Sequence, residues 1–182
     1  MNVSIRVVSH DALSLDDLQG LGALFDAEYR AEFGEWTPDE PYGYASHDVH
    51  VIASHEGEVV GHVGWARRRI GVGDRDVEIA GVGGVLVARH ARGGRLGEQL
   101  MRSAVAAMRE AGGIAFGFLG CREGVVPFYE ACGWTRVVAT ERSLDRTGRL
   151  AETPPGHPLL VYPVIPSGEW PAGDIDLRGR AW

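Results

Sequence analysis

The chain has 182 residues, of which 45% are apolar and 24% charged, and its formal net charge is −7. This length and composition fit one globular domain with a sizeable core, so we predict a single domain over residues 1–182. The acidic balance argues against a nucleic-acid partner, and no apolar run approaches the roughly 20 residues of a membrane span. The N-terminus lacks a signal-peptide pattern and two cysteines are too few for a disulfide framework, so we expect reduced thiols in a cytoplasmic protein.

The first elements in the chain are predicted to be a strand and a helix. Residues 3–8 are rich in valine and isoleucine, which favours a strand. Ser14 followed by Asp17 has the pattern of a capping box and predicts a helix start. Leucine and aromatic residues then recur at helical spacing as far as Tyr29, so we expect a helix with one apolar face.

Residues 32–48 combine prolines, aromatic residues and acids, a composition that predicts a structured loop. Loops of this kind often line ligand sites. Glu35, Trp36 and Asp39 are therefore candidates for substrate contacts. The alternative interpretation is a surface connection held in place by a packed Trp36.

A meander of three strands is predicted next, followed by a helix. Residues 50–54 and 58–69 flank a glycine-bearing turn and predict a hairpin, and a second turn leads into a strand over residues 76–87. Apolar residues at helical spacing then predict a helix over residues 96–111, which ends at a pair of glycines.

The rest of the chain predicts shorter elements. Residues 114–119 are apolar and predict a buried strand, parallel to residues 82–87 through the helical crossover. A short helix (125–131) and two strands (134–139 and 159–164) follow, with a proline-rich loop between the strands and a tail without periodicity. Helices that alternate with the strands of a mixed sheet predict the α/β or α+β class.

The loop before the helix at residue 96 has the composition of a phosphate-binding site. A glycine-bearing loop that opens a helix leaves unpaired N–H groups at the positive end of the helix dipole. Arginine side chains add formal charge at the same place. We expect a diphosphate to be held by residues of this loop: Arg92, Gly93, Gly94, Arg95, Leu96 and Gly97.

Two motifs in this order resemble the GNAT superfamily of acyl-CoA N-acyltransferases. The segment from Val87 to Gly97 is similar to the superfamily's acyl-CoA motif, with Arg95 where the middle glycine is usual. Residues 127–134 (Pro-Phe-Tyr-Glu-Ala-Cys-Gly-Trp) resemble its Phe-Tyr-x-x-x-Gly-Phe segment. The resemblance implies a GNAT fold, a mixed central sheet with splayed parallel strands that bind acyl-CoA and helices on both faces. It also implies acetyl-CoA as co-substrate and no metal.

Within the superfamily the chain most resembles the aminoglycoside 2′-N-acetyltransferases, which share Arg-Gly-x-Arg-Leu in the phosphate loop. Its tail, from Trp170 to Asp174, is similar to theirs, which implies that Asp174 contacts an amino sugar. The same tail is similar to the nodulation N-acyltransferases, which acylate the free amine of a glucosamine oligomer. These resemblances imply transfer of an acetyl group to a primary amine of an amino sugar or aminoglycoside, with antibiotic resistance as one role and a possible homodimer.

The chemistry of acyl transfer suggests roles for several residues. The resemblance places the pantetheine arm beside the backbone of three residues: Val85, Leu86 and Val87. Gly83 and Gly84 suit a bulge that opens the sheet edge, and an N–H near Leu86 would then face the thioester oxygen. Tyr129 is the candidate general acid, because a phenol with a pKa of about 10 can protonate a thiolate whose conjugate acid has a pKa of about 8.5. The alternative for Tyr129 is a packed aromatic residue.

The general base is missing from its expected place. The aminoglycoside 2′-enzymes carry a glutamate that helps to deprotonate the amine, and this chain has Gly83 there. Glu78 lies at an odd spacing on the same strand and so faces the opposite side. His62 has an analogue in the family, but a histidine on a central strand is more often a hydrogen-bonded core residue. Carboxylates of the first loop, and Asp174 in the tail, remain candidates.

Two alternative functions stay open. An N-acyltransferase with a longer acyl donor is suggested by the similarity of the tail to the nodulation enzymes. A degenerate fold that binds acyl-CoA or an antibiotic without turnover, as a sensor, is favoured by the missing glutamate.

Overall fold

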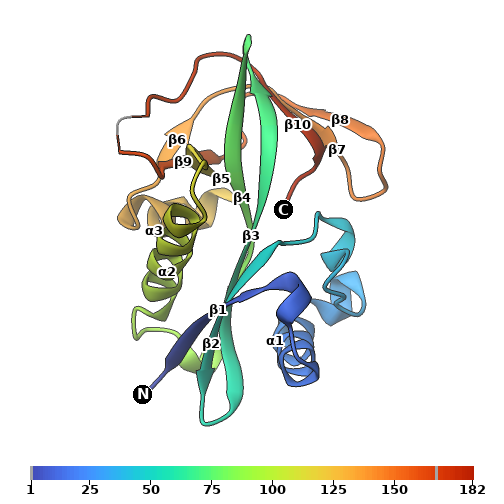
Figure 1. Cartoon of the computed structure of the whole chain (residues 1–182). Coiled ribbons are helices and arrows are strands. Elements are labelled where there is room, and N and C mark those ends of the chain that lie inside the picture. The colour runs from blue at the N-terminus through green and yellow to red at the C-terminus, as the bar shows by residue number, and fades with distance from the viewer. Residues whose placement is uncertain (1, 167) are drawn as a thin grey trace.

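The computed structural model describes residues 2–166 and 168–182, and within them ten strands form one mixed sheet (Figure 1). The strand order is β6-β9-β5-β4-β3-β10-β7-β8, with β2 and then β1 on the lower part of β3.

The strands are β1 (Ser4–Ser9), β2 (Val49–His55), β3 (Glu58–Val72), β4 (Arg75–Val87), β5 (Phe116–Gly120), β6 (Thr135–Val137), β7 (Glu141–Leu144), β8 (Leu150–Thr153), β9 (Leu159–Pro163) and β10 (Ile175–Arg180). The helices are α1 (Leu15–Phe33), α2 (Leu96–Ala111) and α3 (Val126–Ala131). Short 3₁₀ turns are η1 (His10–Ala12), η2 (Pro41–Gly43), η3 (Arg89–Ala91) and η4 (Glu123–Val125).

Helix α1 begins at the predicted cap. The Ser14 hydroxyl accepts a hydrogen bond from the Asp17 amide (3.1 Å), and the Asp17 carboxylate accepts one from the Ser14 amide (3.0 Å). The helix runs past the predicted end to Phe33, where Gly34 with φ of +83° terminates it. Its apolar face packs on the sheet through Leu21, Leu24 and Phe25.

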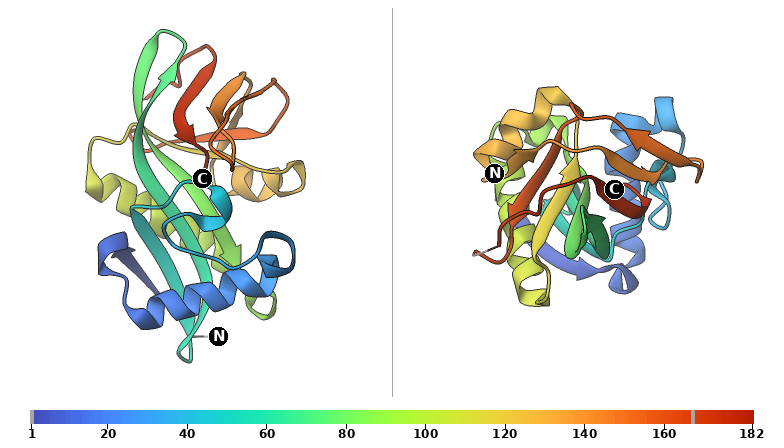
Figure 2. Two further views of the ribbon diagram at one scale, coloured as in Figure 1. Left: turned by 90° about the vertical axis from the view of Figure 1, so that its right-hand side faces the viewer. Right: turned by 90° about the horizontal axis from the view of Figure 1, so that it is seen from above.

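Helix α2 covers the opposite face of the sheet from α1, as the views in Figures 1 and 2 show. Its buried side recurs at helical spacing through Leu100, Met101, Ala104 and Met108, and packs in the largest core cluster. The predicted fold class, a mixed sheet with helices on both faces, is confirmed. Among the described residues, no helix combines the length and apolar character needed to cross a membrane.

Strand β4 separates from β5 after a short parallel contact. The paired residues are Ile79–Gly81 of β4 and Phe116–Phe118 of β5. The prediction that β5 lies parallel to residues 82–87 was therefore wrong in register, although the direction is right. Because the ladder stops at Gly81, the last six residues of β4 have no β5 neighbour, and this splay opens the sheet where the site lies.

Three strands were missed in the sequence. The segment predicted as a proline-rich loop (147–158) contains β8, strand β7 lies just before it, and the tail without periodicity contains β10. Strand β10 lies between β3 and β7, antiparallel to the first and parallel to the second. These strands are four to six residues long, so too few apolar positions alternate to give a pattern.

Candidate active site

The largest cavity is a groove of about 980 Å³ between β4, the loop after it and the start of α3. Its lining includes every residue predicted to bind the co-substrate except Gly94: Val85, Leu86, Val87, Arg92, Gly93, Arg95, Leu96 and Gly97. The sequence motif and the groove therefore coincide.

The loop before α2 presents free backbone amides to this groove. The first helical hydrogen bond runs from the Gln99 amide to the Arg95 carbonyl (3.2 Å), and in the described chain the amides of residues 93–98 donate to no protein acceptor. Gly93 (φ +89°) and Arg95 (φ +58°) both have left-handed backbone conformations, which turn successive amides together. Such a loop at a helix N-terminus suits a phosphate or diphosphate.

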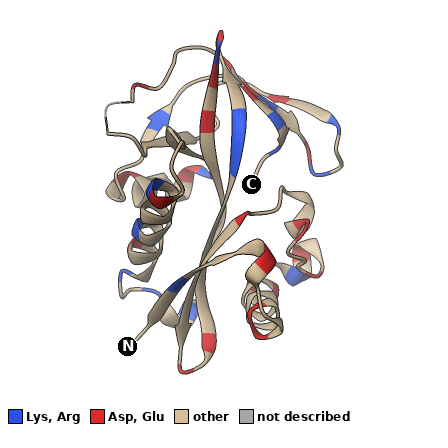
Figure 3. Ribbon diagram, in the orientation of Figure 1, with Lys and Arg blue, Asp and Glu red and all other residues tan. Residues whose placement is uncertain are grey.

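Basic and acidic residues are interspersed along the ribbon in Figure 3, and the arginines of this loop have acidic partners. Arg92 donates to the Val87 carbonyl (2.9 Å) and to Glu28 (3.3 Å), and Arg89 donates to the same Glu28 carboxylate (2.9 Å). The hydrogen bond from Arg89 lowers the pKa of Glu28. Arg95 pairs with Glu98 at 2.6 Å. These ion pairs are largely exposed, so a bound diphosphate can compete for the arginines at small cost.

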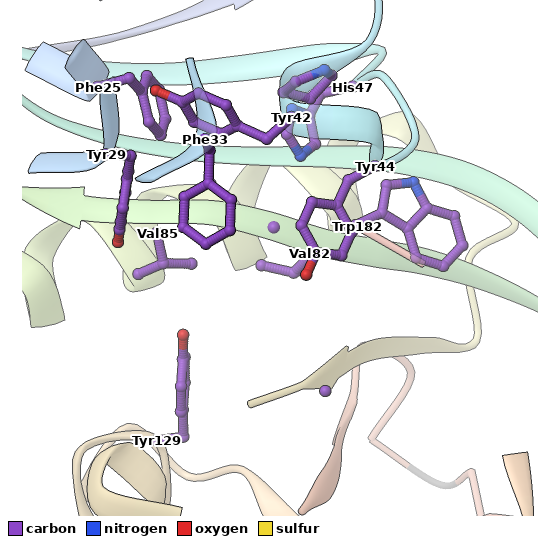
Figure 4. A pocket seen from close by; sticks show the side chains of 14 residues that line it. Phe25, Tyr29, Phe33, Tyr42, Tyr44, His47, Val82, Val85, Tyr129 and Trp182 are labelled. Carbon is purple, nitrogen blue, oxygen red and sulfur yellow. The ribbon is translucent and has the colours of Figure 1, made fainter. Parts of the chain in front are cut away.

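A second cavity, of about 320 Å³, lies against β4 on the side of α1 (Figure 4). Aromatic side chains dominate its lining: Phe25, Tyr29 and Phe33 of α1, Tyr42, Tyr44 and His47 of the segment that follows, and Trp182. Three residues line both cavities: Tyr29, Val85 and Tyr129. The two cavities therefore meet at one wall, where an acyl group held in the groove would face a molecule in the aromatic cavity.

The shared wall includes a bulge in β4. Gly83 pairs with Gly64 and Leu86 pairs with His62, so Gly84 and Val85 together oppose a single residue of β3. Gly84 has φ of +57°, a conformation that favours glycine. The predicted bulge is confirmed.

The bulge also changes which amide is available to a thioester. The Ala88 amide donates to Val60 of β3 (2.9 Å). Because amides alternate in direction along a strand, the Leu86 amide also faces β3, and those of Val85 and Val87 face the open edge. The structure thus points to Val85, in place of the predicted Leu86, as the donor beside the shared wall.

Tyr129 lies on α3 and is 8% exposed, and its hydroxyl points toward the aromatic cavity in Figure 4. Burial raises the pKa of this phenol well above its ordinary value. The group therefore keeps its proton at neutral pH and suits hydrogen-bond donation better than full proton release. Burial also raises the pKa of Cys121 and of Cys132, so both thiols stay neutral.

His47 and Trp182 occupy the space beside Gly83 and were missed in the sequence. A Cβ at position 83 would lie 2.5 Å from the Trp182 carbonyl carbon and 3.0 Å from His47 Nε2. The Arg68 guanidinium lies 3.9 Å from the Trp182 ring and steadies it. A glutamate at position 83 therefore has no room, which explains the glycine. The sequence signal for this crowding was a glycine inside a strand, which marks a place where another group approaches the backbone closely.

The side chain of His47 is buried and unpaired. Its exposure is 4%, and Nε2 has no hydrogen-bond partner among the described residues. Burial, followed by the charges of His62 and His50, holds the pKa of His47 well below its usual value. His47 is therefore neutral at pH 7 and has a basic nitrogen without a partner in the wall of the aromatic cavity.

Three other histidines form a hydrogen-bonded chain that ends at the bulge. His10 Nδ1 lies 3.1 Å from His50 Nε2, His50 Nδ1 lies 2.9 Å from His62 Nε2, and His62 Nδ1 lies 2.7 Å from the Gly84 carbonyl. His62 is therefore a hydrogen-bonded core residue, as the strand position predicted. Within the described chain, no group of His, Cys, Asp and Glu is arranged to hold a metal ion.

Of the residues predicted to contact substrate, the structure places only Gly83 in the aromatic cavity. Trp36 is buried and stacks on the outer side of Phe25 (ring centroids 5.3 Å apart), and Glu35 lies beside it on the outer face of α1. Asp39 is exposed and contacts His10 (3.1 Å). Asp174 accepts a hydrogen bond from the Thr140 amide (3.2 Å), outside both cavities.

The family model described as "Nodulation protein A (NodA)" matches residues 1–180. No curated protein matches the sequence. Among solved structures, Escherichia coli ElaA is 21% identical over 88% of this chain and 99% of its own, with a TM-score of 0.64. Escherichia coli YhbS in complex with CoA is 18% identical over 96% and 89% (TM-score 0.63), and a GNAT family acetyltransferase from Brucella melitensis in complex with acetyl-CoA is 16% identical over 94% of each chain (0.60). These likenesses confirm the GNAT fold.

Proposed function

We propose, from the premise that the chain belongs to the nodulation protein A (NodA) family and is an acyl-CoA-dependent N-acyltransferase, that its acceptor is a primary amine of an amino sugar. Acyl-CoA is the co-substrate, as predicted from the sequence. The amine attacks the thioester directly while both molecules are bound.

The observation that carries this proposal is the wall shared by the two cavities. The groove has the free amides that suit a diphosphate, and the second cavity meets it at Tyr29, Val85 and Tyr129. A donor thioester and an acceptor amine would come together at this wall from opposite sides. Two sites that meet at one point suit a ternary complex without a covalent enzyme intermediate.

The aromatic cavity suits a cationic acceptor with apolar faces. Tyrosine, phenylalanine and tryptophan rings attract an ammonium group over their faces, and they pack against the C–H faces of a sugar ring. The net charge of −7 also favours the approach of a polyamine such as an aminoglycoside. An amino sugar with one free amine and an aminoglycoside are the two members of this class to be compared.

Each bond change has a group beside it. The ammonium of the acceptor first releases a proton to solvent. The free amine nitrogen then attacks the thioester carbon, and the Val85 amide would donate to the oxygen that becomes negative. Attack makes the amine N–H acidic, and His47, neutral and unpaired, is our candidate to accept that proton once the acceptor orders the cavity. The carbon–sulfur bond then breaks, and Tyr129 donates a hydrogen bond to the departing thiolate. His47 returns its proton to solvent, and the thiolate takes up one proton from solvent as it leaves.

A longer acyl donor is the second candidate, and the aromatic cavity favours it. An acetyl group would fill a small part of about 320 Å³ whose lining is mostly apolar. An acyl chain that enters from the groove could share this space with the acceptor.

The test is thiol release measured with a matrix of donors and acceptors. Purified protein is mixed with acetyl-, hexanoyl- or palmitoyl-CoA and with glucosamine, chitooligosaccharides carrying one free amine, aminoglycosides or simple alkylamines. We expect turnover with amino sugars that exceeds turnover with alkylamines at least tenfold. Equal rates for all amines would reject the amino-sugar acceptor. Tight acyl-CoA binding without thiol release would support the sensor and reject catalysis.

A further inference from the structure

The histidine chain, which the proposed mechanism does not use, connects the protein surface to the bulge of β4. It runs from Asp39 through His10, His50 and His62 to the Gly84 carbonyl, with separations of 3.1, 3.1, 2.9 and 2.7 Å. His50 and His62 are fully buried, and Asp39 is exposed. Buried polar groups linked in series restrict one another's orientation.

The direction of every hydrogen bond in this chain follows from its inner end. A backbone carbonyl can only accept, so His62 Nδ1 donates to Gly84, and His62 Nε2 of the neutral ring must accept. His50 Nδ1 therefore donates to His62, and His10 Nδ1 donates to His50. A carboxylate also only accepts, so His10 donates through Nε2 as well. Four links thus contain four protons, one more than three neutral imidazoles carry.

The extra proton belongs at the outer end of the chain. Burial lowers the pKa of His50 to about 3 and that of His62 to about 4, so these two rings are neutral and carry one N–H each. The other two N–H groups of the series are then on His10, whose Nδ1 faces His50 and whose Nε2 faces the Asp39 carboxylate. All the N–H groups between the rings point inward, which strengthens the last hydrogen bond, to Gly84, through polarisation of the series.

This last hydrogen bond sets the orientation of one peptide group. In a trans peptide the carbonyl of Gly84 and the N–H of Val85 point in opposite directions. With the carbonyl held by His62, the Val85 N–H must point away from His62, at a position whose residue lines both cavities. A hydrogen bond to the carbonyl also withdraws charge from the same peptide and makes its N–H a better donor.

Packing leaves this peptide little freedom to turn. A Cβ on Gly84 would lie 3.0 Å from His62 Nδ1 and 3.2 Å from the ring of Phe25. Phe25 also packs edge-on against the His62 ring, with 5.3 Å between centroids. The left-handed φ of Gly84 is a conformation that an unsupported bulge could leave.

From this geometry we infer that His62, supported by His50 and His10, is a positioning residue that holds the Gly84–Val85 peptide with its N–H toward the thioester oxygen. The inference rests on the proposed acyl transfer at this wall and adds the group that prepares the oxyanion site. The role of His62 is indirect, because its imidazole contacts the peptide and not the substrate.

Three variants separate this role from a purely structural one. His62→Leu removes the donor to Gly84. His62→Asn keeps an N–H donor at the position of Nδ1 but breaks the link to His50. His55→Leu replaces a histidine on the same hairpin, whose ring contacts only the Asn2 carbonyl among described groups (2.8 Å), and serves as the control. Thermal unfolding of each variant confirms that it is folded at the assay temperature.

We expect kcat to fall about 30- to 100-fold in His62→Leu, since loss of one oxyanion donor lowers kcat by about 10²–10³. His62→Asn should recover most of this loss, and His55→Leu should match the parent. The Kd of acyl-CoA should stay within about twofold throughout. A folded His62→Leu with the parent's kcat would overturn the inference, as would His62→Asn with no recovery.

A second readout does not depend on finding the acceptor. In ¹⁵N-labelled protein, the imidazole shifts of His62 should report a protonated Nδ1 and a bare Nε2. Addition of acetyl-CoA should move the Val85 amide proton downfield in the parent and much less in His62→Leu. The opposite tautomer, or equal Val85 shifts in both proteins, would reject the inference even if the acceptor assay succeeds. If the assay fails with every amine but these shifts are observed, the proposed acceptor is rejected and the positioning role stands.

Discussion

The groove and the aromatic cavity share one wall but are built in different ways. The groove presents backbone amides and arginine side chains from one stretch of β4, loop and α2, with one acidic partner, Glu28, from α1. The cavity presents aromatic rings from α1, the following segment, α3 and the far end of the chain, together with backbone and valine side chains of β4. The difference suggests a division of labour, in which the groove serves the feature common to all CoA thioesters and the cavity serves one class of acceptor.

The largest expected effect comes from a substitution of Gly94, which should impair the groove and leave the aromatic cavity intact. A Cβ there meets nothing within 4 Å, so Gly94→Glu adds a carboxylate without a packing defect. The carboxylate should occupy the place of the diphosphate and weaken acyl-CoA binding about 100- to 1,000-fold, because the free amides of the loop would bind it instead.

Isothermal titration checks this result, with Gly94→Gln as the matched uncharged control. The control should lose less than about tenfold. Equal affinities for the glutamate variant and the parent would place the diphosphate elsewhere.

Tyr129→Phe tests the role of the wall that the two cavities share. The hydroxyl is the only part removed, so kcat should fall about 100-fold, the scale for loss of one hydrogen-bond donor to a developing negative charge, with an unchanged Kd for acyl-CoA. Tyr162→Phe, which removes a hydroxyl bound to Arg109 (3.2 Å) on the far side of α2, is the control. A variant with the full kcat would show that Tyr129 is a packed aromatic residue without a catalytic role.

Gly83→Ala tests whether the space beside Gly83 is filled by other side chains, whereas the space beside Gly94 is open. The added methyl group meets Trp182 and His47, and we expect the free energy of unfolding to fall by about 1–3 kcal/mol. Gly94→Ala should change it by less than about 0.5 kcal/mol. Chemical denaturation measures both. A neutral Gly83→Ala would mean that Trp182 does not pack against β4 in solution.

The smallest effect is the response of stability to pH. The folded-state pKa values of His50 (about 3) and His62 (about 4) lie below the unfolded value, so the unfolded chain binds more protons as the pH falls below about 6.5. The stability that these two histidines contribute, and that His47 contributes for the same reason, should therefore be full above pH 6.5 and decrease by about 1 kcal/mol for each histidine by pH 5.5. The carboxyl of Glu141, whose pKa burial raises to about 7, acts in the opposite direction, so the histidine contribution is measured as a difference between the parent and a histidine variant. The pKa of Glu28 in the groove is also lowered, but it affects stability only below about pH 4.5.

Denaturation curves at pH 7.5, 6.5 and 5.5 check this expectation. Between pH 7.5 and 5.5 the parent should lose about 1 kcal/mol more stability than His50→Leu. Equal changes in the two proteins would show that His50 is not held neutral by burial.

The groove could be predicted from the sequence because its parts are neighbours along the chain. Loop, glycines and helix start follow one another within residues 87–97, and the hydrogen bonds that shape them are local. The cap of α1, which spans the four residues from Ser14 to Asp17, was predictable for the same reason. Even there the direction of single amides depended on the bulge register, which is why Leu86 was chosen over Val85.

The cavity could not be predicted in the same way because its parts are distant in sequence. Its lining extends from Phe25 to Trp182, and the Trp182 ring reaches β4 only because β10 inserts beside β3. Nothing local marks His47 as part of a site. The one usable signal was the set of glycines at 64, 81 and 83, which showed that something must approach these strands closely without showing what.

The position of β10 has a consequence for how the protein acquires its structure. Ile175 pairs with Val72 across more than a hundred residues of intervening chain, and the β7–β8 hairpin joins the sheet only through β10. Strand β10 is synthesised after the other strands, and closing so long a loop is slow. Most of the sheet can therefore form before β10 pairs with β3. Until then the upper edge of β3 is unpaired, and Trp182 does not yet cover the glycines of β4 at positions 81 and 83. We therefore expect the aromatic cavity to form after the groove.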